Sequence, residues 1–179
     1  GPLLAYVSYQ NKNKFGHSSF DIFVADTLGN DQEITHLADA IYPAFHPNGT
    51  EIIFARRETN STRFILSKAI LNENPKSKAV EWTDIWTPPE SYAYYNIYTP
   101  KYSPDGSKIA FSFFDDKTRG IATINADGTD FKILSEEGID ARDPAWLDNT
   151  TLLFSNNKNG IFNLFKKNLV SGKESPITN

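Results

Sequence analysis

Few residues in this chain have the types and spacing that nucleophilic catalysis requires. The segment Gly16-His17-Ser18-Ser19-Phe20 comes nearest to the Gly-x-Ser-x-Gly pattern of hydrolases, but Phe20 replaces the final glycine. The segment also falls between two predicted strands, whereas the serine of that pattern lies at a turn from a strand into a helix. We therefore interpret it as a polar hairpin loop, predict no catalytic residue, and expect the chain not to be an enzyme.

Metal ligands are equally sparse. The chain has no cysteine, and its three histidines, His17, His36 and His46, lie in different sequence surroundings. A transition-metal site needs several such ligands to converge. Asp105 and Asp127 each precede a glycine, as calcium-loop aspartates do, but an Asp-Gly pair is also what a tight turn requires. We expect no metal site and no cofactor.

Composition excludes further classes of partner. The net charge is −4 and no stripe of lysine or arginine is present, so a nucleic acid partner is not expected. No segment approaches the roughly 20 consecutive apolar residues that cross a bilayer, so we expect no membrane insertion. The start Gly1-Pro2-Leu3-Leu4 lacks the basic region and long apolar run of a signal peptide. The absence of cysteine suits either the cytoplasm or an exported protein that needs no disulfides.

One pattern recurs along the sequence and must position whatever site the chain has. It contains a proline, an aromatic residue two positions later, a polar turn, and an apolar run that ends in phenylalanine. The three copies are residues 42–54, 99–111 and 143–154, and a partial copy begins the chain at Leu4-Ala5-Tyr6-Val7-Ser8. We expect the aromatic residues at the end of these runs to be buried at equivalent positions; they are Tyr6, Phe54, Phe111 and Phe154.

Each part of the pattern has a structural reason. Pro-Asp-Gly reverses the chain because proline presets φ, aspartate bonds the nearby backbone and glycine accepts a positive φ. Apolar runs of β-branched and aromatic residues on either side predict short strands. A second turn follows at Asp127-Gly128 and at Ser171-Gly172. No segment shows a sustained helical period, so the sequence predicts an all-β protein with almost no helix.

The unit resembles the WD40-like repeat of the TolB family, whose pattern is Pro-x-aromatic-Ser-Pro-Asp-Gly, an apolar strand, a later Asp-Gly and a closing Leu-Thr. The copy that runs from Tyr98 to Ser135 is similar almost throughout, whereas the first departs at His46 and Asn48. The resemblance implies a β-propeller of four-stranded antiparallel blades. It covers nearly the whole chain and implies a fold, not a reaction.

The repeat predicts a single β-propeller segment of about three and a half to four blades, at residues 3–40, 41–96, 97–140 and 141–179. Propellers need about 4–8 blades to close, and the first blade here lacks its first strand. The ring is therefore incomplete. We expect the remaining blades to come from chain outside this segment, from another polypeptide, or from a second copy.

The repeat pattern leaves two features of the sequence undetermined: the residues just before each proline and the length of the second unit. In propellers of this type the chain enters the innermost strand just before each proline, at the mouth of the central channel, and there it carries Tyr42, Tyr98, Arg142 and Asp143. Sites collect where residues vary on a fixed scaffold. The second feature is the length of the second unit, in residues 72–96, which adds Trp86 and Tyr94 as possible anchors. We expect Trp82 to belong to the core instead.

The sequence therefore predicts a non-catalytic propeller scaffold that binds a protein or peptide at these six residues. The resemblance adds a periplasmic or cell-envelope location. Two alternatives stay open. One is the substrate-gating propeller of a prolyl-oligopeptidase-type or tricorn-like serine peptidase, and the other is a carbohydrate-active propeller that uses the aromatic segment.

Overall fold

The computed structural model describes residues 2–71, 81–92 and 94–178. The chain divides into two compact units, Gly1–Thr87 and Pro88–Asn179, and each is described here by itself. Residues 72–80 and 93 of the predicted long segment lie outside the described residues.

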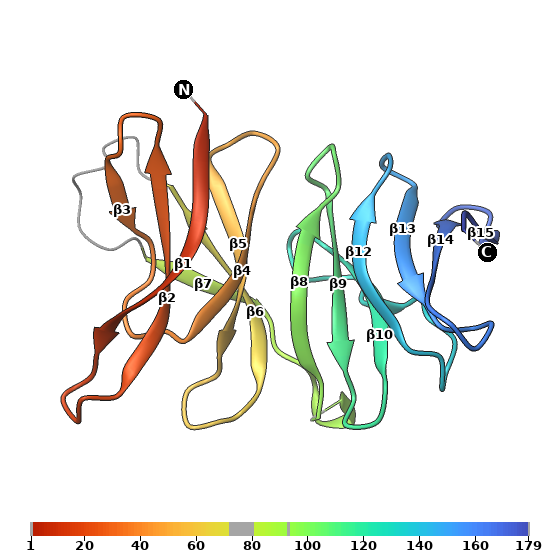
Figure 1. The fold of residues 1–179 in the computed structure, drawn as a ribbon, viewed down its shortest axis with the longest axis horizontal. Coiled ribbons are helices and arrows are strands. Elements are labelled where there is room, and N and C mark those ends of the chain that lie inside the picture. Colours follow the sequence, from red (N-terminus) through yellow and green to blue (C-terminus); the bar gives the residue numbers. More distant parts are fainter. Residues whose placement is uncertain (1, 72–80, 93, 179) are drawn as a thin grey trace. The chain divides into compact units, whose positions relative to one another are not determined.

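The first unit contains two antiparallel sheets (Figure 1). The strands of the first sheet, in the order β1-β2-β3, are β1 (Leu3–Lys12), β2 (Ser18–Asp26) and β3 (Asp31–Glu33). Those of the second, in the order β4-β5-β6-β7, are β4 (Ala40–Phe45), β5 (Glu51–Arg57), β6 (Phe64–Ile70) and β7 (Trp82–Trp86). The first sheet lacks the strand that corresponds to β4, as the partial first repeat predicts.

The second unit contains two four-stranded antiparallel sheets and one short 3-10 helix, η1 (Glu90–Tyr92), which is the one helix in the described residues (Figure 1). The third sheet comprises β8 (Asn96–Tyr102), β9 (Lys108–Phe114), β10 (Arg119–Asn125) and β11 (Lys132–Ile133). The fourth comprises β12 (Ala141–Trp146), β13 (Thr151–Asn156), β14 (Asn163–Asn168) and β15 (Glu174–Pro176). Each strand pairs with its neighbours in sequence, and the all-β prediction is confirmed. No helix in the described part of the chain has the length and apolar character that crossing a membrane requires.

The Pro-Asp-Gly turn forms as the residue types predict. The Asp105 carboxylate accepts hydrogen bonds from the Ser103 hydroxyl at 2.6 Å and from the backbone N–H of Ser107 at 3.0 Å. These bonds lower the pKa of Asp105 below its usual range. Gly106 supplies the positive φ of 73°. The Oδ1 atom of Asp105 thus stabilises the turn, which is the structural role that the Asp-Gly pair predicts.

A hydroxyl clasp holds the last strand of three of the sheets. Thr35, Ser135 and Thr178 each accept a hydrogen bond from a backbone N–H of the strand before the last, over 2.9–3.1 Å; the donors are Ile22 on β2, Ile121 on β10 and Leu164 on β14. The last strands of these sheets are short: β3 has three residues, β11 two and β15 three. β11 stops at Ile133 because the chain then turns to the clasp, where the Leu134 N–H donates to the Ile121 carbonyl.

The core lies between the sheets of each unit. In the first unit Ile22 and Val24 of β2 pack with Ile52 and Phe54 of β5, and Trp82 packs against the same cluster, as predicted. In the second unit Ala110 and Ile121 pack with residues of the fourth sheet, namely Leu152, Phe154 and Phe165.

The predicted set of four buried aromatic residues is correct at three positions and wrong at the fourth. Phe54, Phe111 and Phe154 are buried. Tyr6 is half-buried, and its hydroxyl donates to Asp31. Tyr6 shares its face of the first sheet with Phe23, and within the first unit the core forms on the opposite face of that sheet. The residue keeps its repeat position but has no second sheet to cover it within its own unit.

Candidate functional site

A strained residue precedes the proline of every complete repeat. Tyr42, Thr99 and Asp143 have φ values of 57°, 47° and 54°, in the left-handed region that residues other than glycine rarely adopt. At the same three places the register between first and second strands slips, between Ile41 and Ala44, Tyr98 and Lys101, and Arg142 and Ala145. The innermost strands therefore carry a β-bulge at the predicted mouth position.

The bulge has an energetic cost that Tyr42 and Thr99 do not reduce, whereas aspartate, as at Asp143, tolerates a positive φ better. A non-glycine residue held in the left-handed region costs about 1–3 kcal/mol, and such strain concentrates at functional sites. Thr99 is β-branched, which makes a positive φ especially unfavourable. Bulges also re-aim side chains next to sites. The same strained geometry in all three four-stranded sheets makes this position the leading candidate for a site.

In the second unit Ser112 of β9 connects two of the bulges. The backbone N–H of Asp143 donates to the Ser112 hydroxyl at 2.9 Å, and the Thr99 hydroxyl lies 3.4 Å from it. Ser112 is 1% exposed, so this connection is shielded from water. The strained residues of β8 and β12, which contact one another, are thereby fixed together.

Arg142 is held in a defined orientation. Its guanidinium donates through Nε to Asp140 at 2.9 Å and through Nη2 to the other oxygen of the same carboxylate. Its Cζ lies 4.7 Å from the centre of the Phe162 ring. The hydrogen bond from Arg142, with the charge of Arg119, lowers the pKa of Asp140 below its usual range. A preorganised arginine above an aromatic ring is suited to contact a polar partner.

Tyr98 has a partner that sequence reasoning missed. The Arg119 guanidinium on β10 lies 5.0 Å from the centre of the Tyr98 ring. Nothing in the sequence marks Arg119, because its position is set by pairing β8 through β9 to β10. Tyr98, Arg119, Asp140 and Arg142 therefore form one electrostatically coupled group in the second unit, beside the exposed Asp143.

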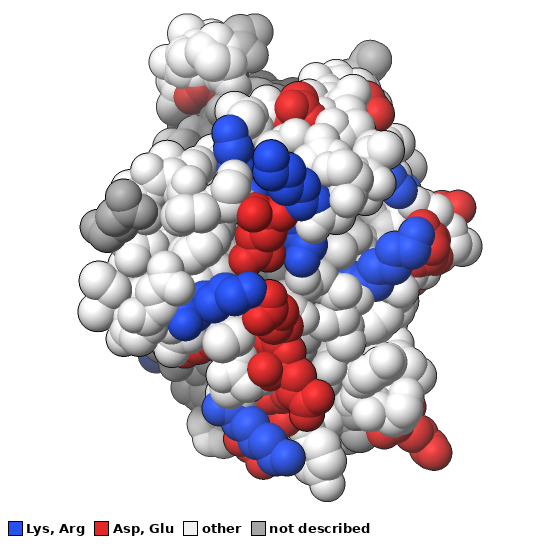
Figure 2. All heavy atoms as spheres, turned by 90° about the vertical axis from the view of Figure 1, so that its right-hand side faces the viewer, with Lys and Arg blue, Asp and Glu red and all other residues white. Residues whose placement is uncertain are grey.

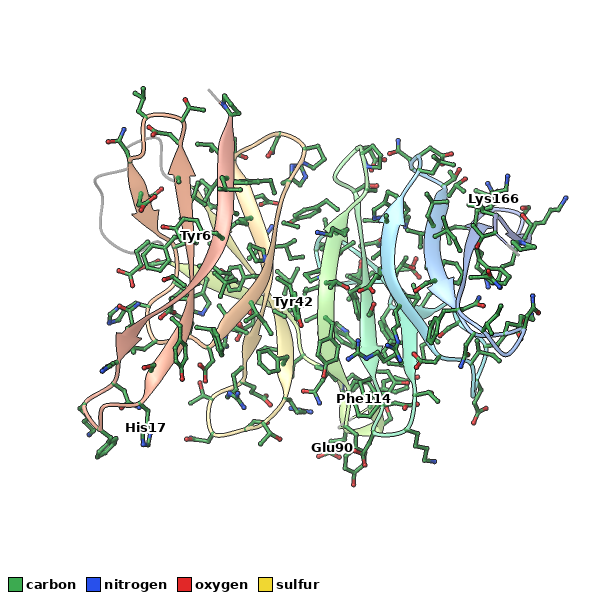
Figure 3. The ribbon with its side chains drawn as sticks, viewed as in Figure 1. Tyr6, His17, Tyr42, Glu90, Phe114 and Lys166 are labelled. Carbon is green, nitrogen blue, oxygen red and sulfur yellow. The ribbon has the colours of Figure 1, made fainter. Side chains whose placement is uncertain are left out.

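The other predicted residues are described in their own units. Tyr42 lies on β4 and is 39% exposed (Figure 3). Trp86 ends β7 and is half-buried, opposite Leu66 beyond a slip in register. Tyr94, in the second unit, joins η1 to β8 and is 72% exposed. Tyr42 and Trp86 thus belong to the first unit, and the remaining four predicted residues to the second.

The segment that superficially resembles a nucleophile motif has ordinary structural bonds. His17 lies at the β1–β2 hairpin, where its N–H donates to Asn13 (Figure 3). The Ser19 hydroxyl accepts the Asp39 N–H at 3.1 Å and contacts the Phe20 carbonyl. Across residues 2–71, 81–92 and 94–178, no three histidine or acidic side chains are grouped closely enough to hold a metal ion.

Replacing Thr99 with glycine should raise the free energy of unfolding by about 1 kcal/mol. Relief of the left-handed strain, about 1–3 kcal/mol, outweighs the extra chain entropy of glycine, about 0.5–1 kcal/mol. Urea unfolding measures the change. Lys101→Gly on the same strand is the matched control and should lose about 0.5–1 kcal/mol, because Lys101 has no positive φ to relieve. Equal losses in both variants would show that the bulge stores no strain.

Comparison with known proteins identifies the fold of this chain but not its family. No family model matches the chain, and no curated protein sequence matches it. Among solved structures it is similar to a protein assigned as TolB from Agrobacterium tumefaciens (14% identity, TM-score 0.74, 97% of this chain and 60% of that one). TolB from Acinetobacter baumannii is similar at 17% identity and a TM-score of 0.71, over 99% of this chain and 41% of that one.

A peptidase also appears among the similar structures. The puromycin-hydrolyzing peptidase of Mycobacterium tuberculosis matches at 13% identity and a TM-score of 0.70, over 99% of this chain and 30% of that one. Identities this low concern the fold alone. The chain has a TolB-like β-propeller fold, as its repeat predicts, and it spans 60% or less of the length of these three proteins.

Proposed function

We propose that this chain is a non-catalytic β-propeller scaffold that binds a protein or peptide partner through the bulged residues before each proline. The contact residues are Tyr98, Arg142 and Asp143 in the second unit and Tyr42 at the corresponding position of the first. Trp86 and Tyr94 are additional anchors. We further propose a location in the bacterial periplasm or cell envelope, which is supported by the similarity of the fold to TolB proteins.

The observation that carries the proposal is the strained bulge repeated in three sheets. Backbone strain concentrates at functional sites, and it supports a contact role for the side chains at this position, of which Tyr42 and Asp143 are exposed. The coupled group of the second unit, together with the neighbouring Asp143, adds an aromatic ring, two arginines and two carboxylates. Such a set can bind a peptide backbone and its polar side chains. We include Arg119 in the site because it lies over Tyr98.

Replacing Tyr98 and Arg142 together with alanine tests the site. A peptide is first selected on the parent chain from a random phage-displayed library, and its affinity is measured by fluorescence polarisation. The double variant should bind at least about tenfold more weakly, because tyrosine and arginine dominate the energy of such contacts. Its circular dichroism spectrum should match that of the parent.

Lys101→Ala with Lys117→Ala is the matched control, since both are surface residues of the same sheet region outside the coupled group. This control should bind as the parent does. Unchanged binding by the Tyr98/Arg142 variant would remove the bulge position from the site. Unfolding of that variant would mean that the two residues serve the fold.

A second candidate function is favoured by the similarity to the puromycin-hydrolyzing peptidase. In that alternative the propeller filters substrates for a hydrolase domain of the same protein. A Gly-x-Ser-x-Gly segment in a domain that follows this one in the full gene would support it. Peptide binding by the isolated chain at the bulge residues, with no such domain encoded, would support the scaffold.

A further inference from the structure

A small pocket lies between the third and fourth sheets, both of which belong to the unit Pro88–Asn179. It lies beside the β12–β13 turn, at the end of the sheets where Figure 1 also shows the β8–β9 turn. Its volume is about 180 Å³, below the roughly 300–1,000 Å³ of sites for drug-sized ligands. Three hydrogen bonds of 2.7–3.0 Å join the two sheets, from Asp105 to Asn149, from Trp146 to Lys101 and from Lys167 to Leu134. The pocket therefore has fixed walls and room for a small ligand only.

The polar wall of the pocket comes from one face of the third sheet. Lys108 of β9 pairs with Asn125 of β10, and Thr123 of β10 pairs with Lys132 of β11. Thr123 and Asn125 are two residues apart on one strand, so all four side chains lie on the same face. Ile121, two residues before Thr123, packs in the core with the fourth sheet. Along β10 this face thus changes from apolar core to polar pocket wall.

The Thr123 hydroxyl is buried without a partner. Thr123 is 5% exposed and lines the pocket, and its hydroxyl makes no hydrogen bond with any residue that the structure describes. Buried polar groups almost always have a hydrogen-bond partner. The hydroxyl therefore points to a ligand atom in the pocket that bonds it.

The repeat explains why the space is open between these two sheets. By strand register Thr123 occupies the place that Val24 has in the first sheet. In the first unit Trp82 packs against the cluster that contains Val24. In the second unit Glu174 stands at the place of Trp82 and pairs with Lys167 at 3.3 Å. The indole ring that packs on this position in the first unit is thus replaced by a carboxylate that binds elsewhere.

The charges that line the pocket leave one ammonium group for an anion. Lys132 pairs with Asp130 at 2.8 Å. The hydrogen bond from Lys132, with the charge of Lys108, lowers the pKa of Asp130 below its usual range, so this carboxylate stays ionised at neutral pH. Lys108 is held instead by a neutral group, the Asn125 side-chain carbonyl, at 2.9 Å, and forms no ion pair among the described residues. Two lysines and one aspartate give the lining a single positive charge, which matches a monoanion.

The rest of the lining is apolar. Leu134 continues the wall of the third sheet, and Leu169 and Val170 face it from the fourth. Val170 is 81% exposed, so the pocket opens to solvent beside it. Figure 2, which views the molecule from the side of the fourth sheet, shows basic and acidic residues interleaved and no broad basic area among the described residues. This surface suits a small anion with an apolar group and not a polyanion.

We propose that the pocket between the third and fourth sheets binds a small carboxylate that carries a branched apolar group. The carboxylate accepts hydrogen bonds from the Lys108 ammonium group and the Thr123 hydroxyl, and the apolar group packs on Leu134, Leu169 and Val170. A free branched-chain carboxylic acid has this chemistry, and so does the C-terminal residue of a peptide that ends in leucine. The proposal does not depend on peptide binding at the bulge residues.

Titration of the chain with isocaproate tests the site. Two-dimensional amide NMR spectra of the isotope-labelled chain should show saturable shifts at Thr123, Thr150 and Leu169. Isocaproamide, which has the same shape without the charge, should bind at least about tenfold more weakly, because hydrogen bonds to charged groups are the stronger ones. Acetylglycyl-leucine with a free C-terminus distinguishes the two sources. Tighter binding than isocaproate would assign the pocket to a peptide C-terminus, and weaker binding would assign it to a free acid.

Two substitutions test the named contacts. Lys108→Gln should weaken isocaproate binding by about tenfold or more, and Thr123→Val by about fivefold. Lys117→Gln, at an exposed lysine outside the pocket, is the matched control and should bind as the parent does. Thermal melts check that each variant is folded. Valine already stands at this place in the first sheet, so Thr123→Val decides the matter if Lys108→Gln does not fold.

Three results would overturn the proposal. The first is the absence of saturable shifts with both isocaproate and acetylglycyl-leucine. The second is equal binding of isocaproate by the parent and the folded Thr123→Val variant. The third is binding of inorganic phosphate as tight as that of isocaproate, which would show that the apolar wall contributes nothing.

Discussion

Truncation of Phe111 to alanine should lower the free energy of unfolding by about 3–5 kcal/mol, the usual cost of a large core truncation. Phe111 is completely buried at the centre of β9, which pairs with both β8 and β10. Its ring stacks with that of Phe131, with 6.3 Å between the ring centres. The change would remove a ring that two strands enclose and would leave a cavity. Equilibrium urea unfolding of the purified chain measures the difference.

Tyr6 offers a matched control, because it occupies the same repeat position in a different environment. Tyr6→Ala removes a ring that is half-buried, together with one hydrogen bond to Asp31. We expect a loss of roughly 1–2 kcal/mol, in proportion to the smaller apolar area removed from contact. Equal losses at Phe111 and Tyr6 would show that the repeat position, and not burial, sets the cost. A loss below about 1 kcal/mol at Phe111 would mean that β9 is not core.

The strands and turns were predictable because their causes are local. Ser103-Pro104-Asp105-Gly106 fixes its own hydrogen bonds within a few residues, so the turn forms wherever that sequence occurs. Apolar runs such as Ile109-Ala110-Phe111 then pair with the next strand along the chain. Because the unit recurs along the sequence, these local patterns together were sufficient to predict the fold correctly.

The details of the candidate site depended on contacts between residues far apart in the sequence. The hydrogen bond from Asp143 to Ser112 spans 31 residues, and Arg119 reaches Tyr98 only after the chain has crossed β9. Residue type also misleads at the bulge, because Tyr42 and Thr99 are poor choices for a positive φ. The six predicted residues therefore stay a prediction, to which the structure adds the strained backbone and Arg119.

Burial at the first sheet could not be read from the repeat alone. The repeat fixes which way Tyr6 and Leu4 face, through strand register. The repeat does not determine which residues pack over Tyr6 and Leu4, because those residues would belong to another sheet. Identical repeat positions therefore have different exposures.

Gly120 lies inside β10, and its position in a strand indicates a role in packing. A glycine inside a strand often marks a close approach of neighbouring groups, and a Cβ placed on Gly120 would lie 2.3 Å from Cζ of Phe113 and 2.6 Å from Oγ of Ser135. Neither neighbour can move easily. The Phe113 ring is buried and stacked on Tyr95, with 4.3 Å between the ring centres, and Ser135 accepts the clasp hydrogen bond from Ile121.

Gly120→Ala should therefore lower the free energy of unfolding by about 2–3 kcal/mol, the upper part of the usual cost of overpacking. Gly138→Ala separates this steric effect from backbone strain, because Gly138 has a φ of 77° and open space around its Cβ position. That control should lose only about 1 kcal/mol. Phe113→Leu, which shortens the opposing side chain, should recover part of the loss when combined with Gly120→Ala. The two single changes and the double change form a cycle whose coupling urea unfolding can measure. A double variant that loses the sum of the two single losses would show that Gly120 is not needed to accommodate the Phe113 ring.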